Sequence, residues 1–508
     1  MLLNSPKFGF FIGAILLSGT SAFAQTAEPA GASDADADIV VTAQRRAERL
    51  QDVPLAVSAI TSDDMKVRQI NNTLDLVNYV PNLIGHNNTA LGTANTYSLR
   101  GLANTESIST FDPPVGTYVD DIYIARQGAN NFSFFDIERV EVLRGPQGTL
   151  FGRNTTGGAI NVILRKPSDH ITGFADASYG RYNRAQLRAS IDLPVSEKLL
   201  TKLSGYYIRS DGYVDNRVTG QKLNGEKSWG VRGALRGLPS DTVTWDLAAS
   251  YTYSSVANLP NFRDAKTGDR ISFTPLLSNK GLGTGLVSPG LADIPAGNVA
   301  RSALFSSNIQ VDVGDDAALN FITGYSYMRQ KYMTDSFAGL SSASVVFDGV
   351  NFISGARGTS TPLVNDSWSK QFSQEIKVTG KAFNDILSYV GGFYYVNERN
   401  WTNFANISVP LAGAATVSGD RVMRNNTEAY AGYFQGDVHL APQLTFTAGI
   451  RYTDEDKTIA YTPNASPLAR SSAINQPFNT QDVLNAGIPV ELRSKVWTPR
   501  FALNYKIT

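Results

Sequence analysis

Short and long connections alternate along the C-terminal two thirds of this chain, and this regularity limits its possible folds more than any other feature. Alternating apolar and polar residues mark about twelve strands between residues 171 and 508. Short connections such as 194–198 alternate with long ones such as 255–302 and 455–494, and only 180–183 departs from this order. Loops that long are uncommon in compact soluble domains, whereas membrane β-barrels carry short turns at one end and long loops at the other.

The predicted strands differ in length but share one apolar face and one polar face. They are 171–179, 184–193, 199–209, 228–237, 243–254, 303–313, 318–329, 369–380, 386–397, 427–438, 443–454 and 495–507. A soluble β-sandwich would bury the apolar face in a core, whereas a barrel turns it toward lipid. In the last strand the predicted lipid-facing residues are Trp497, Phe501, Leu503, Tyr505 and Ile507. Because the connections favour a barrel, residues 166–508 are predicted to be membrane all-β, forming an antiparallel transmembrane β-barrel.

Composition excludes several classes of function. The chain has 45 basic and 45 acidic residues, so it lacks the surplus of positive charge that a nucleic-acid binder shows. It has no cysteine, which excludes disulfide scaffolds, thiolate metal sites and thiol catalysis. Its histidines, His86, His170 and His439, are too scattered for a local metal motif. No G-x-S-x-G sequence or metal motif is present, so we expect neither an enzyme nor a bound cofactor.

The N-terminus is predicted to direct export. Lys7, the apolar stretch 8–17 and the A-x-A pattern ending at Ala24 are typical of a signal peptide over residues 1–24. Residues 25–50 follow as a tether that is small, polar and acidic at its start. Within it, the β-branched run Asp38-Ile39-Val40-Val41-Thr42-Ala43 is either an ordinary first strand or a strand that adds to another protein's sheet. The basic stretch 45–49 after it is predicted to be a solvated face.

Residues 51–165 are predicted to form a compact α/β unit. A helix begins near Thr61, a second short helix begins at Asn72 and stops before Pro81, and strands are expected at 97–100, 115–119, 140–143 and 159–164. The glycine-rich run 145–158 lacks the Gly-Lys-Ser/Thr end of a phosphate loop. We therefore interpret its glycines as tight packing inside another structure. Asp120 and Asp121 are predicted on a strand, pointing to opposite faces.

Several motifs in this unit occur in the order found in one family. The sequence IERVEVLRGP at 137–146, continued by the glycines of 148–158, resembles the plug-domain signature of TonB-dependent outer-membrane receptors. Leu99-Arg100-Gly101 and the segment 118–121 resemble earlier plug motifs of that family, and 38–43 resembles its TonB box. The residues that carry the resemblance in the plug are Arg100, Gly101, Asp120, Asp121, Glu138, Arg139, Glu141, Arg144, Gly145, Gly157 and Gly158.

The resemblance implies a barrel of about 22 strands around the plug, a size whose lumen is filled. About twelve strands are expected here, and a closed barrel of twelve would be too narrow for a folded plug. The chain is therefore expected to be the N-terminal part of a longer receptor, and residues 1–508 alone are not expected to form a working transporter. Loops 85–96 and 103–113 are expected to be the outer apices of the plug, open to solvent at Ala94 and Ser107.

The resemblance also implies a function in the outer membrane of a Gram-negative cell, in contact with its lipid. TonB, energised through ExbB and ExbD, would pair with the box and pull, and the typical ligand would be a ferric siderophore. Haem, cobalamin, oligosaccharides and aromatic compounds are alternatives, and a passive porin is an alternative of another class. Because a siderophore already saturates its iron, no metal ligand is required of the protein. Neither the ligand nor its contact residues can be read from the sequence.

Overall fold

The computed structural model describes residues 39–88, 93–104, 106–130, 134–256, 259–264, 267–273, 282–335, 346–347, 352–353, 360–410, 413–464, 466–470 and 479–506. The expected signal peptide, Asp38 of the box and Ile507 lie outside these ranges. Among the described residues, no helix is both long enough and apolar enough to cross a membrane.

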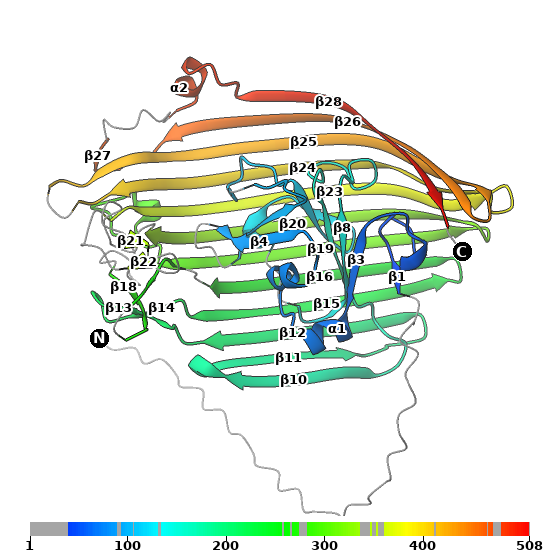
Figure 1. Cartoon of the computed structure of the whole chain (residues 1–508), viewed down its shortest axis with the longest axis horizontal. Helices are drawn as coiled ribbons and strands as arrows, with labels where there is room; N and C mark the ends of the chain where they lie inside the picture. The colour runs from blue at the N-terminus through cyan, green and yellow to red at the C-terminus, as the bar shows by residue number, and fades with distance from the viewer. Residues whose placement is uncertain are drawn as a thin grey trace, which may run out of the picture. The chain divides into compact units, whose positions relative to one another are not determined.

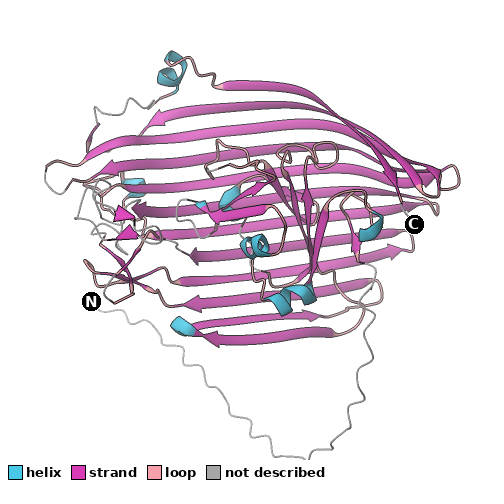
Figure 2. Ribbon diagram, viewed as in Figure 1, coloured by secondary structure: helices cyan, strands magenta, loops and turns pink. Residues whose placement is uncertain are grey.

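One large sheet dominates the described residues, and its long strands pair antiparallel in chain order (Figures 1 and 2). They are β10 (Thr172–Gly180), β11 (Arg184–Asp192), β12 (Leu199–Ser210), β15 (Glu226–Ser240), β16 (Val243–Val256), β19 (Gly297–Val313), β20 (Ala317–Asp335), β23 (Pro362–Ala382), β24 (Leu387–Ser408), β25 (Thr416–Ala441), β26 (Leu444–Pro463) and β28 (Glu491–Tyr505). Every predicted strand is confirmed. We call this sheet the wall; within the described residues β10 and β28 are its edges.

Several strands of the wall extend beyond their predicted bounds on the side of the long connections. β24 was predicted to end at residue 397 but continues to Ser408, and β25 begins at Thr416 rather than at 427. These added residues still pair, as Phe404 does with Arg421. Alternation in a sequence records a lipid face opposite a polar face, so it fades where both faces meet polar surroundings. Backbone pairing needs no such pattern and continues.

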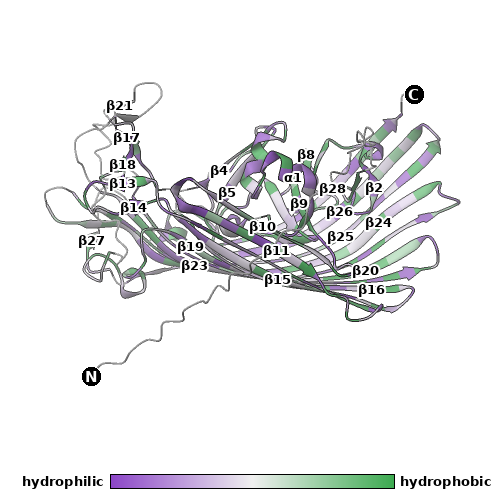
Figure 3. Cartoon of the chain, turned by 90° about the horizontal axis from the view of Figure 1, so that it is seen from below, coloured by the Kyte–Doolittle hydropathy of each residue, from purple (hydrophilic) through white to green (hydrophobic). Residues whose placement is uncertain are grey.

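The outward face of the wall is apolar, as predicted. Phe501 is 73% exposed and Leu503 is 68% exposed, and Figure 3 shows apolar residues distributed along these strands. Aromatic rings pair across neighbouring strands, with centroids 4.8 Å apart for Tyr452 and Trp497 and 4.9 Å apart for Tyr395 and Tyr430. Apolar surface this extensive is unfavourable in water, which supports the prediction that this face meets lipid.

The long connections carry small folded elements of their own. These are β13 (Val214–Asn216), β14 (Lys222–Leu223), β17 (Phe262–Arg263), β18 (Arg270–Ser272), η6 (Pro289–Leu291), β21 (Val346–Phe347), β22 (Phe352–Ile353), β27 (Ala469–Arg470) and α2 (Thr480–Asn485), while η5 (Arg181–Asn183) forms the short connection between β10 and β11. Buried Leu291 and Ile294 pack with Met333 and Val364 of the wall. The described parts of these connections are thus packed onto the ends of the strands.

A second, smaller sheet with the order β3-β8-β9-β6-β7 lies against the wall, and we call the unit around it the plug. Its strands are β3 (Val57–Thr61), β6 (Val115–Val119), β7 (Ile122–Ile124), β8 (Ile137–Arg144) and β9 (Gly158–Leu164), and beside them stands the hairpin of β4 (Leu83–Asn87) and β5 (Asn95–Leu99). The short elements are β1 (Val40–Val41), β2 (Glu48–Arg49), η1 (Leu50–Asp52), α1 (Ser62–Arg68), η2 (Thr73–Asn78) and η4 (Gln127–Ala129).

The helices of the plug begin where the sequence predicted. The Thr61 hydroxyl accepts the N–H of Asp64, and the Asp64 carboxylate accepts the N–H of Thr61, a capping box that starts α1. Asn72 and Asp75 make the same reciprocal cap at η2. The core of the plug is almost entirely its own, and Leu304 is the wall residue that packs against it. The plug thus has its own hydrophobic core beside the wall.

Asp120 and Asp121 do not lie on a strand, so that prediction was wrong. Both have positive φ, 46° and 68°, and form the two-residue turn between β6 and β7, where Val119 pairs with Ile122. Two consecutive left-handed residues are typical of the tight hairpin turn that matches strand twist, and Asp tolerates this conformation. The turn directs the two carboxylates toward different partners.

The glycine-rich run packs tightly, as interpreted from the sequence. Gly158 begins β9 with a φ of 153°, and a Cβ there would lie 2.5 Å from Leu99 Cδ2 and still closer to the Leu143 carbonyl oxygen. Gly152 leaves similar room for the guanidinium of Arg451 in the wall. These glycines therefore allow backbone and wall to approach closely.

Gly158→Ala is expected to destabilise the plug by about 1–3 kcal/mol or more, because the added methyl meets backbone that cannot move aside. Trypsin digestion of the protein in detergent should then cut the plug while sparing the wall. Gly101→Ala is the matched control, since its φ of 81° is strained too but no atom lies within 4 Å of the added Cβ. Equal protection of the two variants would contradict the packing argument.

Candidate functional site

The segment resembling a TonB box is folded against the plug. Val40 and Val41 pair with Arg49 and Glu48 in a short antiparallel ladder, and Val41 is 0% exposed. The backbone N–H of Thr42 donates to Glu141 Oε1 at 2.8 Å, and its hydroxyl lies 3.2 Å from each oxygen of that carboxylate. In this arrangement the backbone of the segment is already paired with a strand of its own chain.

Glu141 therefore links the signature motif of β8 to the box. Its side chain is fully buried and also accepts a bond of 2.8 Å from Arg139 Nε, while Arg139 pairs in turn with the half-exposed Glu138. Burial raises the pKa of Glu141, and its bonds from Thr42 and Arg139 oppose that rise. The structure thus brings these three motif residues together next to Thr42.

The basic stretch after the box is solvated only in part, contrary to the prediction: the Arg49 side chain is 55% exposed, but Arg45 and Arg46 are covered. Arg45 is buried and pairs with Glu375 of β23, and its guanidinium also lies 3.6 Å from Asp121. Arg46 pairs with Asp437 of β25. Their acidic partners are distant in sequence, and only the fold brings them into reach. The stretch fastens the box region to the wall near its short turns.

The two turn carboxylates have separate contacts. Asp120 accepts the N–H of Leu164 at 3.0 Å and lies 3.4 Å from Lys166 Nζ. Asp121 lies between Arg45 and Lys377, the latter at 3.5 Å. Burial alone would raise the pKa of Asp121, but these cations outweigh it and lower the pKa to about 2. Asp121 is therefore ionised at physiological pH.

The remaining motif residues hold the loops of the plug together. Arg100 places its guanidinium against Gly145, where a Cβ would clash with Nη1. The N–H of Gly145 donates to the Gly157 carbonyl at 2.9 Å, and the N–H of Arg144 donates to the Ala56 carbonyl at 2.9 Å. Gly101 follows in a left-handed turn. These contacts give this group a packing role inside the plug, apart from the box.

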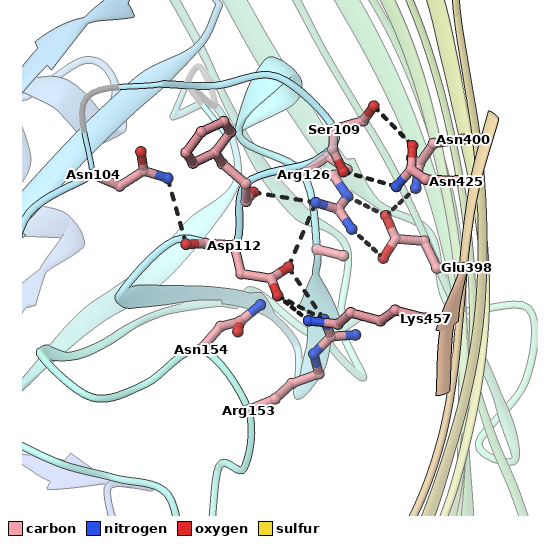
Figure 4. A network of polar contacts seen from close by, with 12 residues as sticks. Asn104, Ser109, Asp112, Arg126, Arg153, Asn154, Glu398, Asn400, Asn425 and Lys457 are labelled. Carbon is pink, nitrogen blue, oxygen red and sulfur yellow. Dashed lines mark hydrogen bonds and ion pairs between the residues drawn. The ribbon is translucent and has the colours of Figure 1, made fainter. Parts of the chain in front are cut away.

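A second group of contacts joins the plug to the wall nearer the long connections (Figure 4). Arg126 of the plug makes a bidentate pair with Glu398 of β24, with Nη2 2.8 Å from Oε2. Glu398 is 0% exposed and also accepts a bond of 2.9 Å from Asn400. Such a pair holds two segments 272 residues apart in sequence.

Asp112 is the centre of the same network. It lies 3.2 Å from Arg153 Nη2 and 3.6 Å from Arg126 Nη1, and it also pairs with Lys457 of β26. Arg153 lies 3.0 Å from Glu455 of the same strand. Burial would raise the pKa of Asp112, but the three cations outweigh it and hold the pKa well below its usual range. The network therefore stays charged.

The expected plug apices lie on the side of the long connections. Thr93 accepts a bond of 2.6 Å from Asn298 of β19, and Ser109 exchanges bonds of 3.0 and 2.8 Å with Asn425 of β25. Ala94 is fully buried against Tyr332, so the expectation that it is open to solvent was wrong. The box lies at the other end, beside the short turns.

Sequence reasoning missed Arg126, Asp112 and Glu398. Each is an ordinary charged residue in its local sequence, and only the fold shows that they meet. Within the ranges that the structure describes, no three His, Asp or Glu side chains gather as a metal site. The arrangement can hold a plug in place through ion pairs between plug and wall.

Two family models match the chain. Residues 49–159 match the TonB-dependent receptor plug domain, and residues 295–508 match the TonB-dependent receptor-like β-barrel. The chain belongs to the TonB-dependent receptor family. Members of this family are proteins of the Gram-negative outer membrane and act as receptors and transporters. The structural plug, residues 57–164 from β3 to β9, falls almost wholly within the first match.

Curated relatives and solved structures agree with this assignment. The chain is 25% identical over 395 residues to a pesticin receptor of Yersinia enterocolitica, covering 77% of this chain and 50% of that protein. It is 21% identical over 433 residues to a ferric enterobactin receptor of Pseudomonas aeruginosa, covering 80% and 55%. The crystal structure of the ferric yersiniabactin uptake receptor of Yersinia pestis superposes with a TM-score of 0.66 at 18% identity, covering 89% and 62%. The chain spans about half the length of the curated relatives it matches.

In the full-length receptor, Glu398→Ala is expected to weaken the docking of the plug by about 3–5 kcal/mol, because Arg126 is left as a buried charge without its main partner. Urea should then expose the plug to trypsin at a lower concentration than in the parent protein. Asp456→Ala is the control, since Asp456 pairs with Arg493 at the surface and such pairs contribute about 0–1 kcal/mol. Equal urea profiles would show that the buried pair does not hold the plug.

Proposed function

We propose that this chain supplies the plug and part of the wall of a receptor that imports a ferric siderophore across the outer membrane, using energy delivered by TonB. One observation carries the proposal: the box pairs within its own chain, with Val41 fully buried, and the plug behind it is fastened to the wall by buried ion pairs. A plug held in this way prevents passive diffusion, which also argues against a porin. Import therefore requires work on the plug.

The box is the segment on which a mechanical force can act. No nucleoside triphosphate is available at the outer membrane. The energy therefore has to be mechanical and has to arrive from the periplasm. TonB, energised through ExbB and ExbD, can add its own strand to residues 39–43, provided that Val41 leaves its ladder with Glu48. Thr42 must then give up its bonds to Glu141. Pulling on this segment acts directly on β8 of the plug.

The ligand class is supported by the names of relatives. The similar proteins include receptors for ferric enterobactin and ferric yersiniabactin, and an iron-regulated outer membrane virulence protein of Vibrio cholerae is 31% identical over 169 residues. A vitamin B12 transporter of Vibrio vulnificus is 23% identical over 286 residues, which keeps cobalamin as the second candidate. The proposal is tested by expressing the full-length receptor in cells with and without TonB and measuring uptake of ⁵⁵Fe-enterobactin, ⁵⁵Fe-yersiniabactin and labelled cobalamin. Uptake that does not require TonB would overturn it.

Val41→Pro is expected to abolish uptake in the full-length receptor while ligand binding at the cell surface persists. Proline removes the backbone donor that strand addition uses and fixes φ. Binding to intact cells at 0 °C and energised uptake at 37 °C separate the two effects. Val41→Thr keeps the donor and the β-branched shape and should transport normally. Wild-type uptake by the proline variant would show that residues 39–43 are not the coupling site.

Glu141→Ala is expected to release the box without ligand. Hydrogen bonds to a charged group contribute about 1.5–3 kcal/mol, so the exposed fraction should rise about tenfold or more. The readout is maleimide labelling of Val41→Cys from the periplasmic side in cells without TonB, since the chain has no cysteine of its own. Glu138→Ala is the matched control, because Glu138 pairs with Arg139 but makes no contact with Thr42. Equal labelling of the two variants would contradict a latch at Glu141.

A further inference from the structure

The wall presents two different surfaces to the plug. In the sector from β23 to β26, large and charged side chains meet it, among them Glu375, Glu398, Tyr433, Arg451, Glu455 and Lys457. In the sector of β15, β16 and β19 the lining is mostly uncharged apart from Arg232 and Asp246. Many of its side chains are small, among them Ser250, Thr252, Ser254, Ala300, Ser302 and Ser306. The first sector holds the plug by several buried ion pairs. In the second, Arg232 of β15 pairs with Asp136 of the plug, and Leu304 of β19 packs against the plug core.

Two cavities lie between the plug and the second sector. The upper cavity, about 100 Å³, reaches from Thr93 at the plug apex down past β9. The lower cavity, about 260 Å³, is lined by Thr42 of the box and by Asn161 of β9. Strands β15, β16 and β19 provide the wall of both, so neither cavity depends on the edge strands β10 and β28. The cavities follow one side of the plug from its apex to the box.

Arg232 of β15 separates them, since it lines both cavities. Its Nη1 donates to Asp136 at 2.8 Å and to the Arg165 carbonyl at 3.1 Å, and the side chain is 2% exposed. Its Nε and the Oδ1 of Asn161 are buried polar atoms with no hydrogen-bond partner among the described residues. Buried polar atoms without a hydrogen-bond partner favour a polar ligand in this space.

We propose that the import passage opens between the plug and the sector of β15, β16 and β19, that the plug stays on the sector from β23 to β26, and that Arg232 closes the passage at rest. The proposal rests on the import function proposed above. Ligands of this size need about 300–1,000 Å³, so the passage has to widen. Withdrawal of the box enlarges the lower cavity because Thr42 is part of its lining, and a shift of β8 moves Asp136 away from Arg232.

Two disulfide tethers distinguish the sectors in the full-length receptor. Thr93→Cys with Asn298→Cys joins the plug apex to β19, where the native side chains touch at 2.6 Å. Ser109→Cys with Asn425→Cys joins it to β25, where they touch at 3.0 Å. Both pairs lie on the side of the long connections, and residues 1–508 contain no competing cysteine. The probes are ⁵⁵Fe-enterobactin and ⁵⁵Fe-yersiniabactin, measured before and after reduction of the disulfide.

Uptake through the first tether is expected to fall about tenfold or more and to return on reduction, because the plug can no longer part from β19. The second tether is expected to leave uptake within about twofold of the reduced form. Unchanged uptake through the first tether, or loss through the second, overturns the proposal. If the untethered receptor takes up neither probe, the proposed ligand class is wrong. The position of the passage is then tested by the next experiment.

That experiment needs no ligand. Arg232→Ala is expected to raise the ionic conductance of the purified full-length receptor in a planar bilayer about threefold or more, because the two cavities join. Arg236→Ala is the matched control: it lies on the same face of β15, but its bidentate partner is Asp246 in the wall, at 2.7 and 2.8 Å. Heat-modifiable mobility in electrophoresis verifies that both variants are folded. Equal conductance of the two variants overturns the closing role of Arg232.

Discussion

Several buried charges on the inner face of the wall take their partners from the plug. Glu398 is fully buried, and its bidentate pair with Arg126 offsets the cost of removing its charge from water. The same holds for Glu375 and Arg45. This requirement positions the plug on one sector of the wall, keeps the loops near Asp112 in place and directs the chain after the box. Charges that the plug removes from water are stabilised because the plug also supplies their partners.

The large sheet could be predicted from the sequence because lipid on one side and polar surroundings on the other impose alternation on every strand. The caps at Thr61 and Asn72 were equally visible, since a capping box is local. Other features depend on contacts between distant residues. The burial of Arg45 requires Glu375, which is 330 residues away, and the left-handed turn at Asp120 follows from the twist of its hairpin. Ala94 is buried because Tyr332 covers it.

The signature motif of the plug combines two physical tasks that one sequence pattern conceals. Gly145 and Gly157 let loops approach closely, and Arg100 packs against the first of them. Glu141 does something different, since its carboxylate lies on β8 and holds Thr42 of a segment 99 residues earlier. The first task concerns the stability of the plug alone. The second joins β8 to the segment 40–43, so a movement of β8 changes the contacts of that segment.

The strands of the wall continue past the point where their sequence pattern fades. In β24 and β25 the pairing persists to Ser408 and Thr416, so the chain there forms a braced ribbon and not a free loop. A ribbon of paired strands resists bending, so it holds the residues next to its tip at a fixed position relative to the wall. Substitutions at the tip can then change the surface that the ribbon exposes, while the paired strands below it and the wall remain unchanged.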